Sequence, residues 1–388
     1  MKQLDKYAQV GISQTIQVNW EEFMEYKHSI IDPMPTILAK SDRSLGVDIY
    51  QAHGYLLDAH IVQVGNDQIW GKTIVLATGE HPSRLNIPGK DLLHDSRDFL
   101  SMQHAPHHIT FIGAGYISLE FASMMREMGA EVDIVQHSDH VLRGLYGKYV
   151  QKLVAKLQKE GVTFYFGETI SKVLPNSYTY TVQCKSGLEF ETNYIVDATG
   201  RVPNVNNLGL EKVGINFSEQ GIQVDNHLRT NVQNIYASGD VIDKAIDKLT
   251  PTATFECNYI TEDILNPDNP PIQYPAIPRV VYSLPRIAQV GIKIDDAKND
   301  VRFSTVVIPF GKAKEFETKR DLDAEATFVL NQEKQIVGAA VYGDSAAELI
   351  NFLTLIVNQK MTPKDIKNLI FAFPTVSHSI TSSLSDLA

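Results

Sequence analysis

The chain has 388 residues, enough for two or three domains that each bury a core. Its formal net charge of -11 argues against nucleic acid or an anionic membrane surface as the main partner. No apolar stretch reaches the roughly 18 residues that span a bilayer. Residues 1–10 are polar and lack the pattern of a signal or transit peptide. With two cysteines, Cys184 and Cys257, neither a disulfide framework nor a cysteine metal cluster is expected. We therefore expect a cytoplasmic enzyme or binding protein.

Short β-branched runs alternate with helical patterns along the chain, which predicts an α/β fold with parallel strands. In chain order the predicted elements are a strand at 72–77, a strand at 108–112, a helix at about 116–128, a strand at 132–135, a helix at 149–160, and strands at 194–198 and 235–238. The proline-rich stretch 266–278 indicates a domain boundary. Beyond it, strands at 301–309, 326–330 and 336–342, followed by two helices, predict a separate α+β domain.

Residues 109–135 carry the most informative pattern: a strand, a Gly-x-Gly-x-x-Ser turn, a helix and a second strand. This unit of about 30 residues is typical of dinucleotide binding. Gly113 permits the tight turn, and Gly115 lets the backbone approach a pyrophosphate at the helix N-terminus, where N–H groups and the dipole favour anions. Ser118 is small enough for close packing of helix against strand. The predicted NAD(P) site also includes Ala114, Tyr116 and Ile117.

The end of the second strand should distinguish the two nicotinamide cofactors. An acidic residue there accepts hydrogen bonds from the ribose of NAD, whereas a basic residue pairs with the 2′-phosphate of NADP. This strand ends in Gln136-His137-Ser138, without an acid, and Arg143 follows. His137 and Arg143 could pair with a phosphate, or they could be two exposed loop residues. The pattern favours NADP and leaves NAD open.

Three motifs in sequence order resemble those of the pyridine nucleotide–disulfide oxidoreductases, the family of glutathione reductase, dihydrolipoamide dehydrogenase and mercuric reductase. They are Gly-Ala-Gly-Tyr-Ile-x-x-Glu at 113–120, Ala-Thr-Gly-Arg-x-Pro-Asn at 198–204 and Ala-x-Gly-Asp at 237–240. Leu249-Thr-Pro251 and Ile277-Pro-x-Val-Val-Tyr-Ser283 fit the same pattern, so the resemblance covers nearly the whole chain.

The resemblance implies an α/β fold with two dinucleotide-binding, Rossmann-like domains, the first of them incomplete, and a C-terminal α+β dimerisation domain. Residues 1–105 would be a remnant of the FAD-binding domain, 106–200 the NAD(P)-binding domain, 201–268 the returning part of the FAD domain, and 269–388 the dimerisation domain of a homodimer.

The resemblance also implies roles for individual residues. Tyr116 would lie between nicotinamide and flavin as a lid, with Glu120 near the flavin on the same helix. Asp240 would accept a hydrogen bond from the ribityl chain of FAD. His53 and Gly54 would provide a backbone contact to the FAD adenine. The other implied cofactor contacts are Thr78, Gly79, Gly200, Arg201, Leu249 and Thr250.

The chain departs from the family pattern in three respects. The family begins with a strand, Gly-x-Gly-x-x-Gly and a helix, followed by a redox-active Cys-x4-Cys pair and a lysine that pairs with the acid at position 120. Met1 falls where that unit should already have ended, so we expect an N-terminally truncated chain with impaired FAD binding. Cys184, in a predicted strand, and Cys257, in a predicted helix, are interpreted as buried apolar residues. The C-terminal His-Pro-Thr-x-x-Glu motif reads Phe373-Pro-Thr-Val-Ser-His378, and Phe373 cannot carry a proton.

His104, His107 and His108 precede the nucleotide-binding strand without a supporting carboxylate and indicate a solvated linker, so no metal site is expected. We expect an FAD-dependent NAD(P)H oxidoreductase that passes a hydride from NAD(P)H to the flavin and does not reduce disulfides. Its electron acceptor could be a quinone, a metal ion or oxygen. The alternatives are a catalytically silent dinucleotide-binding dimer and a truncated gene product without function.

Overall fold

The computed structural model describes residues 18–266, 268–313 and 319–387, so the polar residues 1–10 lie outside it. The chain divides into two compact units, which are described separately. The first unit comprises Met1–Trp20, Arg84–Thr199 and Pro275–Ala388, and the second comprises Glu21–Ser83 and Gly200–Tyr274. No helix in the described part of the chain is long and apolar enough to cross a membrane.

The nucleotide-binding part of the first unit is built on a parallel four-stranded sheet with the order β12-β6-β7-β8. Its elements are α4 (Ser96–Leu100), β6 (His108–Ile112), α5 (Tyr116–Glu127), β7 (Glu131–Gln136), α6 (Gly147–Lys159), β8 (Val162–Phe166) and β12 (Tyr194–Asp197). An antiparallel meander of β9 (Ile170–Pro175), β10 (Tyr180–Cys184) and β11 (Glu189–Thr192) follows β8, and the short helix η1 (Lys90–Leu92) precedes α4.

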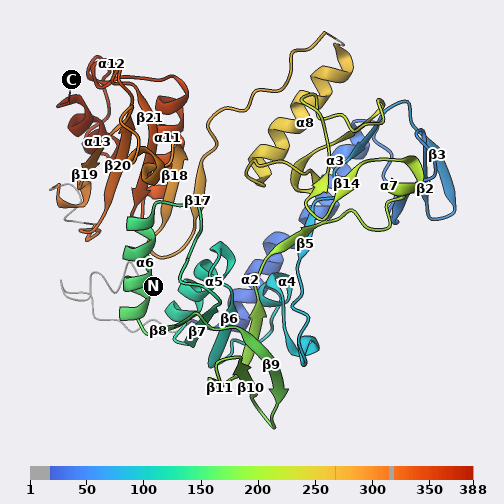
Figure 1. The fold of residues 1–388 in the computed structure, drawn as a ribbon, viewed down its shortest axis with the longest axis horizontal. Coiled ribbons are helices and arrows are strands. Elements are labelled where there is room, and N and C mark those ends of the chain that lie inside the picture. The colour runs from blue at the N-terminus through green and yellow to red at the C-terminus, as the bar shows by residue number, and fades with distance from the viewer. Residues whose placement is uncertain (1–17, 267, 314–318, 388) are drawn as a thin grey trace. The chain divides into compact units, whose positions relative to one another are not determined.

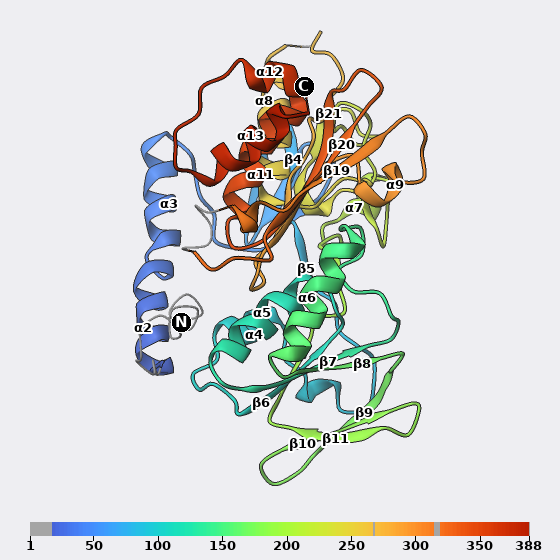
Figure 2. The ribbon, with the colours of Figure 1, turned by 90° about the vertical axis from the view of Figure 1, so that its left-hand side faces the viewer.

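Both faces of the parallel sheet are covered, which explains why its strands are continuous apolar runs. The helices α5 and α6 lie on one face and the meander β9–β11 lies toward the other (Figure 2). On the helix side, Ile109 and Phe111 of β6 pack in one core with Leu119 of α5 and Leu153 of α6. On the meander side, Ile112 packs in a second core with residues of β9 and β10. The helix N-termini therefore meet the carboxyl edge of the sheet, where dinucleotides bind.

The C-terminal part of the first unit is an antiparallel five-stranded sheet with the order β17-β18-β21-β20-β19 (Figure 1). Its strands are β17 (Arg279–Val281), β18 (Ile287–Gly291), β19 (Ser304–Ile308), β20 (Glu325–Leu330) and β21 (Ile336–Tyr342). The helical elements are α9 (Ile294–Ala297), η3 (Phe310–Lys312), α11 (Ala346–Asn358), α12 (Pro363–Lys367) and α13 (Val376–Ser385).

The expectation that the C-terminal part builds its own apolar core is only partly correct. One core does belong to it alone, formed by residues such as Phe328 of β20 and Ile350 of α11. The core of the nucleotide-binding part, however, also takes in Val329 and Tyr342 from the C-terminal sheet. Within this shared core, Tyr149 Oη and Thr327 Oγ1 form a buried hydrogen bond of 2.8 Å. The two parts of the first unit are therefore continuous in their packing.

The second unit is assembled from small sheets and one long helix. A parallel pair joins β4 (Ile74–Leu76) to β16 (Ile235–Ala237), and an antiparallel pair joins β5 (Glu80–Pro82) to β13 (Arg201–Pro203). The remaining elements are α2 (Trp20–Ile31, whose first residue falls in the first unit), α3 (Met34–Ser44), β1 (Gly54–Leu56), β2 (Ile61–Val64), β3 (Asp67–Trp70), α7 (Leu210–Val213), β14 (Phe217–Ser218), β15 (Gly221–Ile222), η2 (Gly239–Val241) and α8 (Thr250–Leu265). The central strands β4 and β16 both end at turns that carry predicted site residues.

Candidate functional site

The turn between β6 and α5 combines one glycine that the fold requires with one that it does not. Gly113 has a φ of +95°, and a Cβ added to it would lie 2.8 Å from the carbonyl oxygen of Ala198. Gly115 has a φ of -83°, and an added Cβ would meet no protein atom within 4 Å. The protein's own packing therefore explains Gly113 but leaves open space beside Gly115. A ligand that approaches the backbone closely would use that space.

The N-terminus of α5 is arranged to receive an anion. Gly115 is the N-cap residue, and it supplies no side-chain cap to the first turn. Tyr116 is 53% exposed at the start of the helix, and Ile117 follows it half-buried. Ser118 is fully buried against the sheet, as its small size allows, and its Oγ has no hydrogen-bond partner in the described residues. These features match a pyrophosphate site at the carboxyl edge of a parallel sheet.

Glu120 lies on the same helix, and its carboxylate accepts a hydrogen bond of 2.9 Å from the backbone N–H of Tyr282. Burial raises the pKa of Glu120, and this hydrogen bond opposes the rise. Within the described residues the partner of Glu120 is thus a backbone amide from the segment before β18. Sequence reasoning alone does not find this amide, because nothing in the local pattern at Glu120 points to a residue so far along the chain.

The segment after β7 carries the residues that were expected to distinguish NADP from NAD. His137 and Arg143 are both exposed, and neither forms a hydrogen bond or an ion pair with a described residue. Arg143 lines a groove of about 750 Å³ beside α6. Gln136, which precedes them, is buried, and its side chain accepts a hydrogen bond of 3.1 Å from the Ala114 N–H. The sequence placed Gln136 at the strand end but did not predict that it turns inward.

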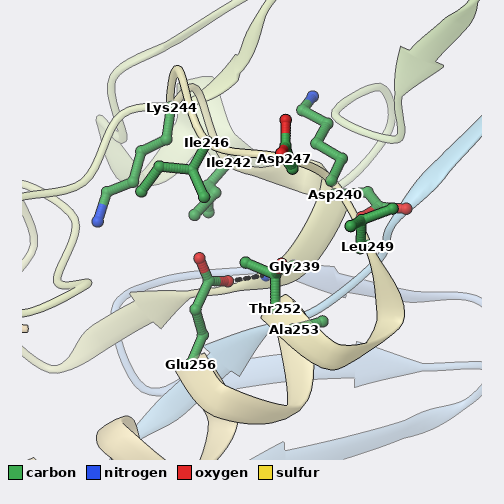
Figure 3. Close-up of a pocket in the computed structure, with 11 residues that line it drawn as sticks. Gly239, Asp240, Ile242, Lys244, Ile246, Asp247, Leu249, Thr252, Ala253 and Glu256 are labelled. Carbon is green, nitrogen blue, oxygen red and sulfur yellow. Dashed lines mark hydrogen bonds between the residues drawn. The ribbon is translucent and has the colours of Figure 1, made fainter. Parts of the chain in front are cut away.

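In the second unit, the strand β16 leads into Gly239 and Asp240, directly beside the N-terminus of α8. Figure 3 shows the arrangement: Lys244 and Ile246 come from the loop after η2, and Thr252, Ala253 and Glu256 come from α8. The buried Glu256 carboxylate accepts hydrogen bonds of 2.6 Å from the Gly239 N–H and from Tyr274 Oη. The enclosed space among these residues is about 10 Å³, roughly one water molecule. A ligand larger than a water molecule therefore does not fit in this enclosed space.

Three charged side chains, Glu80, Arg201 and Lys248, influence Asp240. Lys248 Nζ lies 2.5 Å from one oxygen of Glu80, and Arg201 Nε lies 3.6 Å from the other. Burial raises the pKa of Asp240, as does the neighbouring Glu80, whereas Arg201 and Lys248 lower it. Asp240 itself forms no hydrogen bond within the described residues and is free to accept one. Glu80 and Lys248 were not among the predicted site residues.

The other residues expected around the flavin serve mainly the second unit's own structure. Thr78 and Asn204 exchange two hydrogen bonds, and the Asn204 N–H donates to the carbonyl of Gly79 at 2.9 Å. The Gly200 carbonyl accepts from the Ser83 N–H at 3.0 Å. Leu249 is the N-cap of α8 and supplies no side-chain cap, so the first turn from Thr250 has none. His53, beside Gly54, bonds through Nε2 to the Asn207 carbonyl at 3.0 Å.

Two expectations about histidine and cysteine are wrong. His108 does have a supporting carboxylate, because its Nε2 lies 2.8 Å from Asp133 Oδ2 on the adjacent strand β7. This pairing raises the pKa of His108, and no group of three metal-ligating side chains occurs in the described parts of the chain. Cys184 is buried as expected, but Cys257 is exposed. The buried stripe of α8 runs through Thr252, Glu256, Ile260 and Asp263, and Cys257 lies outside it.

The C-terminal segment from Phe373 to His378 leads into α13. Phe373 is 71% exposed, and its ring centroid lies 5.1 Å from that of His378. The Nδ1 atom of His378 is buried and has no hydrogen-bond partner among the described residues. Within the described residues, His378 therefore has no carboxylate partner that would orient it for proton transfer, and Phe373 cannot carry a proton.

The comparisons with known proteins agree with this geometry. A family model described as pyridine nucleotide-disulphide oxidoreductase matches residues 9–256, and one described as the dimerisation domain of that family matches residues 277–384. Glutathione reductase of Burkholderia cepacia is 28% identical over 369 residues, which cover 94% of this chain and 81% of that protein. Dihydrolipoyl dehydrogenase of Bacillus subtilis (strain 168) is 28% identical over 392 residues, covering 98% and 83%.

A solved structure of the HOCl-induced flavoprotein disulfide reductase RclA from Escherichia coli matches with a TM-score of 0.87. It is 21% identical, and the match covers 99% of this chain and 88% of that one, which is a likeness of fold. The expected fold class and the expected family are both confirmed. The chain belongs to the pyridine nucleotide–disulfide oxidoreductase family.

Proposed function

We propose that this protein is an FAD-dependent NAD(P)H oxidoreductase that prefers NADPH and does not use a dithiol relay. The observation that carries the proposal is the contrast between Gly113, which the fold requires, and Gly115, which faces open space at an uncapped helix N-terminus. In this proposal residues 106–200 bind the nicotinamide cofactor, and Tyr116 and Glu120 lie at its reactive end.

The residues of the second unit fit the ribityl and ring end of a flavin. The Asp240 carboxylate is available to a hydroxyl donor, and the N-terminus of α8 has no side-chain cap. Thr252 Oγ1 is buried without a hydrogen-bond partner in the described residues. When bound, FAD would supply the two-electron acceptor for the hydride of a reduced nicotinamide. In this proposal the turn at 113–118 holds the pyrophosphate of the nicotinamide cofactor, and Asp240 accepts a hydrogen bond from the ribityl chain of FAD.

The preference for NADPH rests on the charges after β7. The strand itself ends in Gln136, whose side chain is turned into the protein, so the strand end offers no acid to the ribose hydroxyls. The first carboxylate of the following loop, Asp139, is exposed and lies 3.5 Å from His140 Nδ1. The exposed His137 and Arg143 are able to pair with a 2′-phosphate. NADH remains the alternative cofactor and is measured in the same experiment.

The chemistry of the two cysteines supports the proposal that no dithiol relay operates between them. Burial raises the pKa of the Cys184 thiol to about 11, so it is protonated at neutral pH. Cys257 is exposed on α8, and both cysteines are free thiols. With no thiol relay among the described residues, bound FAD would supply electrons to an acceptor without the help of a cysteine of this chain. Residues 269–388 would hold a homodimer together.

The purified protein tests the proposal in two steps. Flavin absorbance in the isolated protein is the expected result, and calorimetric titration should show NADPH binding more tightly than NADH. A colourless protein that cannot be loaded with FAD but still binds NADPH would be a silent dinucleotide-binding protein and would overturn the oxidoreductase assignment. A protein that binds neither nicotinamide cofactor would overturn the nucleotide site itself.

A further inference from the structure

Gln136 is a buried polar side chain at the carboxyl end of β7, 6% exposed, and it joins two parts of the nucleotide site. Its Oε1 accepts from the backbone N–H of Ala114, the middle residue of the turn at 113–115. Its Nε2 donates to Ser138 Oγ at 2.9 Å and to the carbonyl oxygen of His140 at 3.0 Å. One side chain therefore contacts both the phosphate-binding turn and the loop that follows β7.

The orientation of this amide is determined by its partners. Rotating it by half a turn would set its NH₂ group against the Ala114 N–H and its oxygen against the His140 carbonyl, donor to donor and acceptor to acceptor. In the observed orientation both N–H donors are used within the protein. Gln136 thus has no donor left for a ribose, and it faces away from solvent, so its part in cofactor binding is indirect.

The loop after β7 is attached to the same turn by a second, independent bond. The backbone N–H of Leu142 donates to the carbonyl oxygen of Ala114 at 3.0 Å, and the Leu142 side chain is buried. Leu142 has a φ of +47°, a conformation rare for leucine that its surroundings must maintain. Ala114 is consequently held through both its N–H and its carbonyl, by the two ends of the segment 136–142.

This double attachment sets where the basic side chains stand. His140 and Arg143 are exposed, and both line the groove of about 750 Å³ beside α6. The exposed Asp139 also lines this groove, with one carboxylate oxygen 3.5 Å from His140 Nδ1, so Arg143 is the cation of the loop without an acidic partner in the described residues. His140 is held at its carbonyl by Gln136, and Arg143 directly follows Leu142. The positions of His140 and Arg143 relative to the turn at 113–115 therefore depend on hydrogen bonds within the protein, and not on contacts with the cofactor. Preorganised charges bind an anion more tightly than charges on a mobile loop, because less entropy is lost on binding.

We propose that Gln136 is a positioning residue that couples the phosphate-binding turn to the loop at 137–143, thereby places Arg143 and sets the preference for NADPH over NADH. The inference rests on the proposed function, since it presumes that the turn holds a nicotinamide cofactor. This inference differs from the proposed function because it assigns the preference for NADPH to the buried Gln136 amide and not to His137 and Arg143 alone.

The test compares Gln136→Met, which keeps the length of the side chain and removes its hydrogen bonds, with the unaltered protein. Calorimetric titrations with NADPH and with NADH give two dissociation constants for each protein. Both should rise in the variant because the Ala114 N–H loses its partner. The constant for NADPH should rise about tenfold more than that for NADH, the size of one lost charge-assisted hydrogen bond.

A double-mutant cycle with Arg143→Ala separates positioning from a general loosening of the turn. If Gln136 acts by placing Arg143, Gln136→Met should change the ratio of the two constants much less in the Arg143→Ala background. Thr110→Val is the matched control, since Thr110 is a fully buried polar residue on the adjacent strand β6 and its Oγ1 has no partner in the described residues. It should leave both constants unchanged.

Ser138→Ala keeps the test decisive should Gln136→Met fail to fold, because it removes one acceptor of the amide and leaves the bond to Ala114. The dissociation constant for NADH divided by that for NADPH measures the preference for NADPH. A fall in this ratio in either Gln136→Met or Ser138→Ala supports the proposal. An unchanged ratio in a folded Gln136→Met protein, or an undiminished effect without Arg143, overturns it. An unaltered protein that binds NADH more tightly also overturns it but leaves the dinucleotide site standing, whereas binding of neither cofactor refutes the proposed function.

Discussion

The Glu120 carboxylate accepts a hydrogen bond of 2.9 Å from the backbone N–H of Tyr282, a residue 162 positions further along the chain. One turn later on the same helix, Ser123 Oγ accepts from the Leu284 N–H at 3.3 Å. These two bonds attach α5, the helix of the nucleotide site, to the segment that leads into β18. They give Glu120 a neutral donor as its described partner, so burial is the main influence on its pKa, which is raised.

The first prediction follows from that buried charge. In Glu120→Gln the amide oxygen can still accept from Tyr282, but no charge has to be buried, so the variant should be more stable than the parent at pH 7. The folded-state pKa of Glu120 lies above its ordinary value of 4.5, so the folded parent is favoured when Glu120 is protonated. The parent loses this stability as pH rises through the raised pKa, because a charged carboxylate must then be buried. The difference in unfolding free energy between the variant and the parent should therefore shrink as pH falls toward 4.5. Urea unfolding at several pH values measures it, and a variant less stable at pH 7 would contradict the burial argument.

The second prediction separates the two glycines of the turn. Gly113→Ala should destabilise the protein by about 1–3 kcal/mol or more, because alanine is strained at positive φ and its Cβ would approach the Ala198 carbonyl. Gly115→Val should change stability by no more than about 1 kcal/mol, the scale of an N-cap change. It should abolish NADPH binding, because its side chain fills the space left for a pyrophosphate. Unfolding curves and calorimetry measure both, and unchanged NADPH affinity in Gly115→Val would refute the site.

The sequence predicts the regular core of the first unit well. The strands β6 and β21 have the predicted bounds, and α5 and α6 differ from prediction only at their ends. The reason is physical: buried parallel strands are continuous apolar runs, and glycines such as Gly129 and Gly161, both at positive φ, close the helices. The turn at 113–118 is predicted equally well from the sequence, because backbone geometry determines its residue types.

Features that depend on which segments meet in space are not predicted. The partner of Glu120 and the bond between Tyr149 and Thr327 join positions more than 150 residues apart. The inward direction of Gln136 depends on the loop that closes over it. The pairing of His108 with Asp133 could have been predicted, since adjacent parallel strands bring their amino ends together. Such a prediction would require the register of β6 against β7, which the sequence pattern does not provide.

The third prediction concerns the hydrogen bond inside the first unit's core. Thr327→Val leaves the Tyr149 hydroxyl buried without a partner and should cost about 1–3 kcal/mol of stability. Tyr149→Phe should cost a similar amount, and the double variant should cost less than the sum, because neither partner is then left unsatisfied. Tyr178→Phe, at a site 93% exposed, is the control and should change stability by less than about 0.5 kcal/mol. Urea unfolding measures all four, and strict additivity would show that the bond contributes nothing.

The fourth prediction concerns the assembly. The family model for the dimerisation domain covers residues 277–384, so the full chain should elute as a homodimer. Light scattering during gel filtration should give twice the mass of one chain at micromolar concentration. A mass that stays at one chain across the accessible concentration range would count against the assignment of residues 269–388 as an interface.

The last prediction is that this protein does not reduce disulfides. A dithiol relay needs two sulfurs that can form a bond, with Cα atoms within about 7 Å, and one of them must be a reactive thiolate. Cys184 is buried, and its pKa is raised to about 11, so it supplies almost no thiolate at neutral pH. Cys257 is exposed on α8, and neither cysteine takes part in a disulfide. The family resemblance places Phe373 where the family has the histidine of its proton transfer, and a phenyl ring cannot carry a proton.

The assay for this prediction follows NADPH oxidation by the FAD-loaded protein with glutathione disulfide, lipoamide or thioredoxin as acceptor, beside a quinone and oxygen. We expect turnover with the disulfides to stay at the oxygen background, whereas an acceptor that takes electrons directly from reduced flavin should exceed it. The Cys184→Ser/Cys257→Ser variant is the matched control and should behave like the parent with every acceptor. Disulfide turnover that is lost in the variant would show that one of the two cysteines is redox-active after all. Turnover that persists in the variant would place the chemistry on residues other than cysteine, and either result would contradict the absence of disulfide reduction.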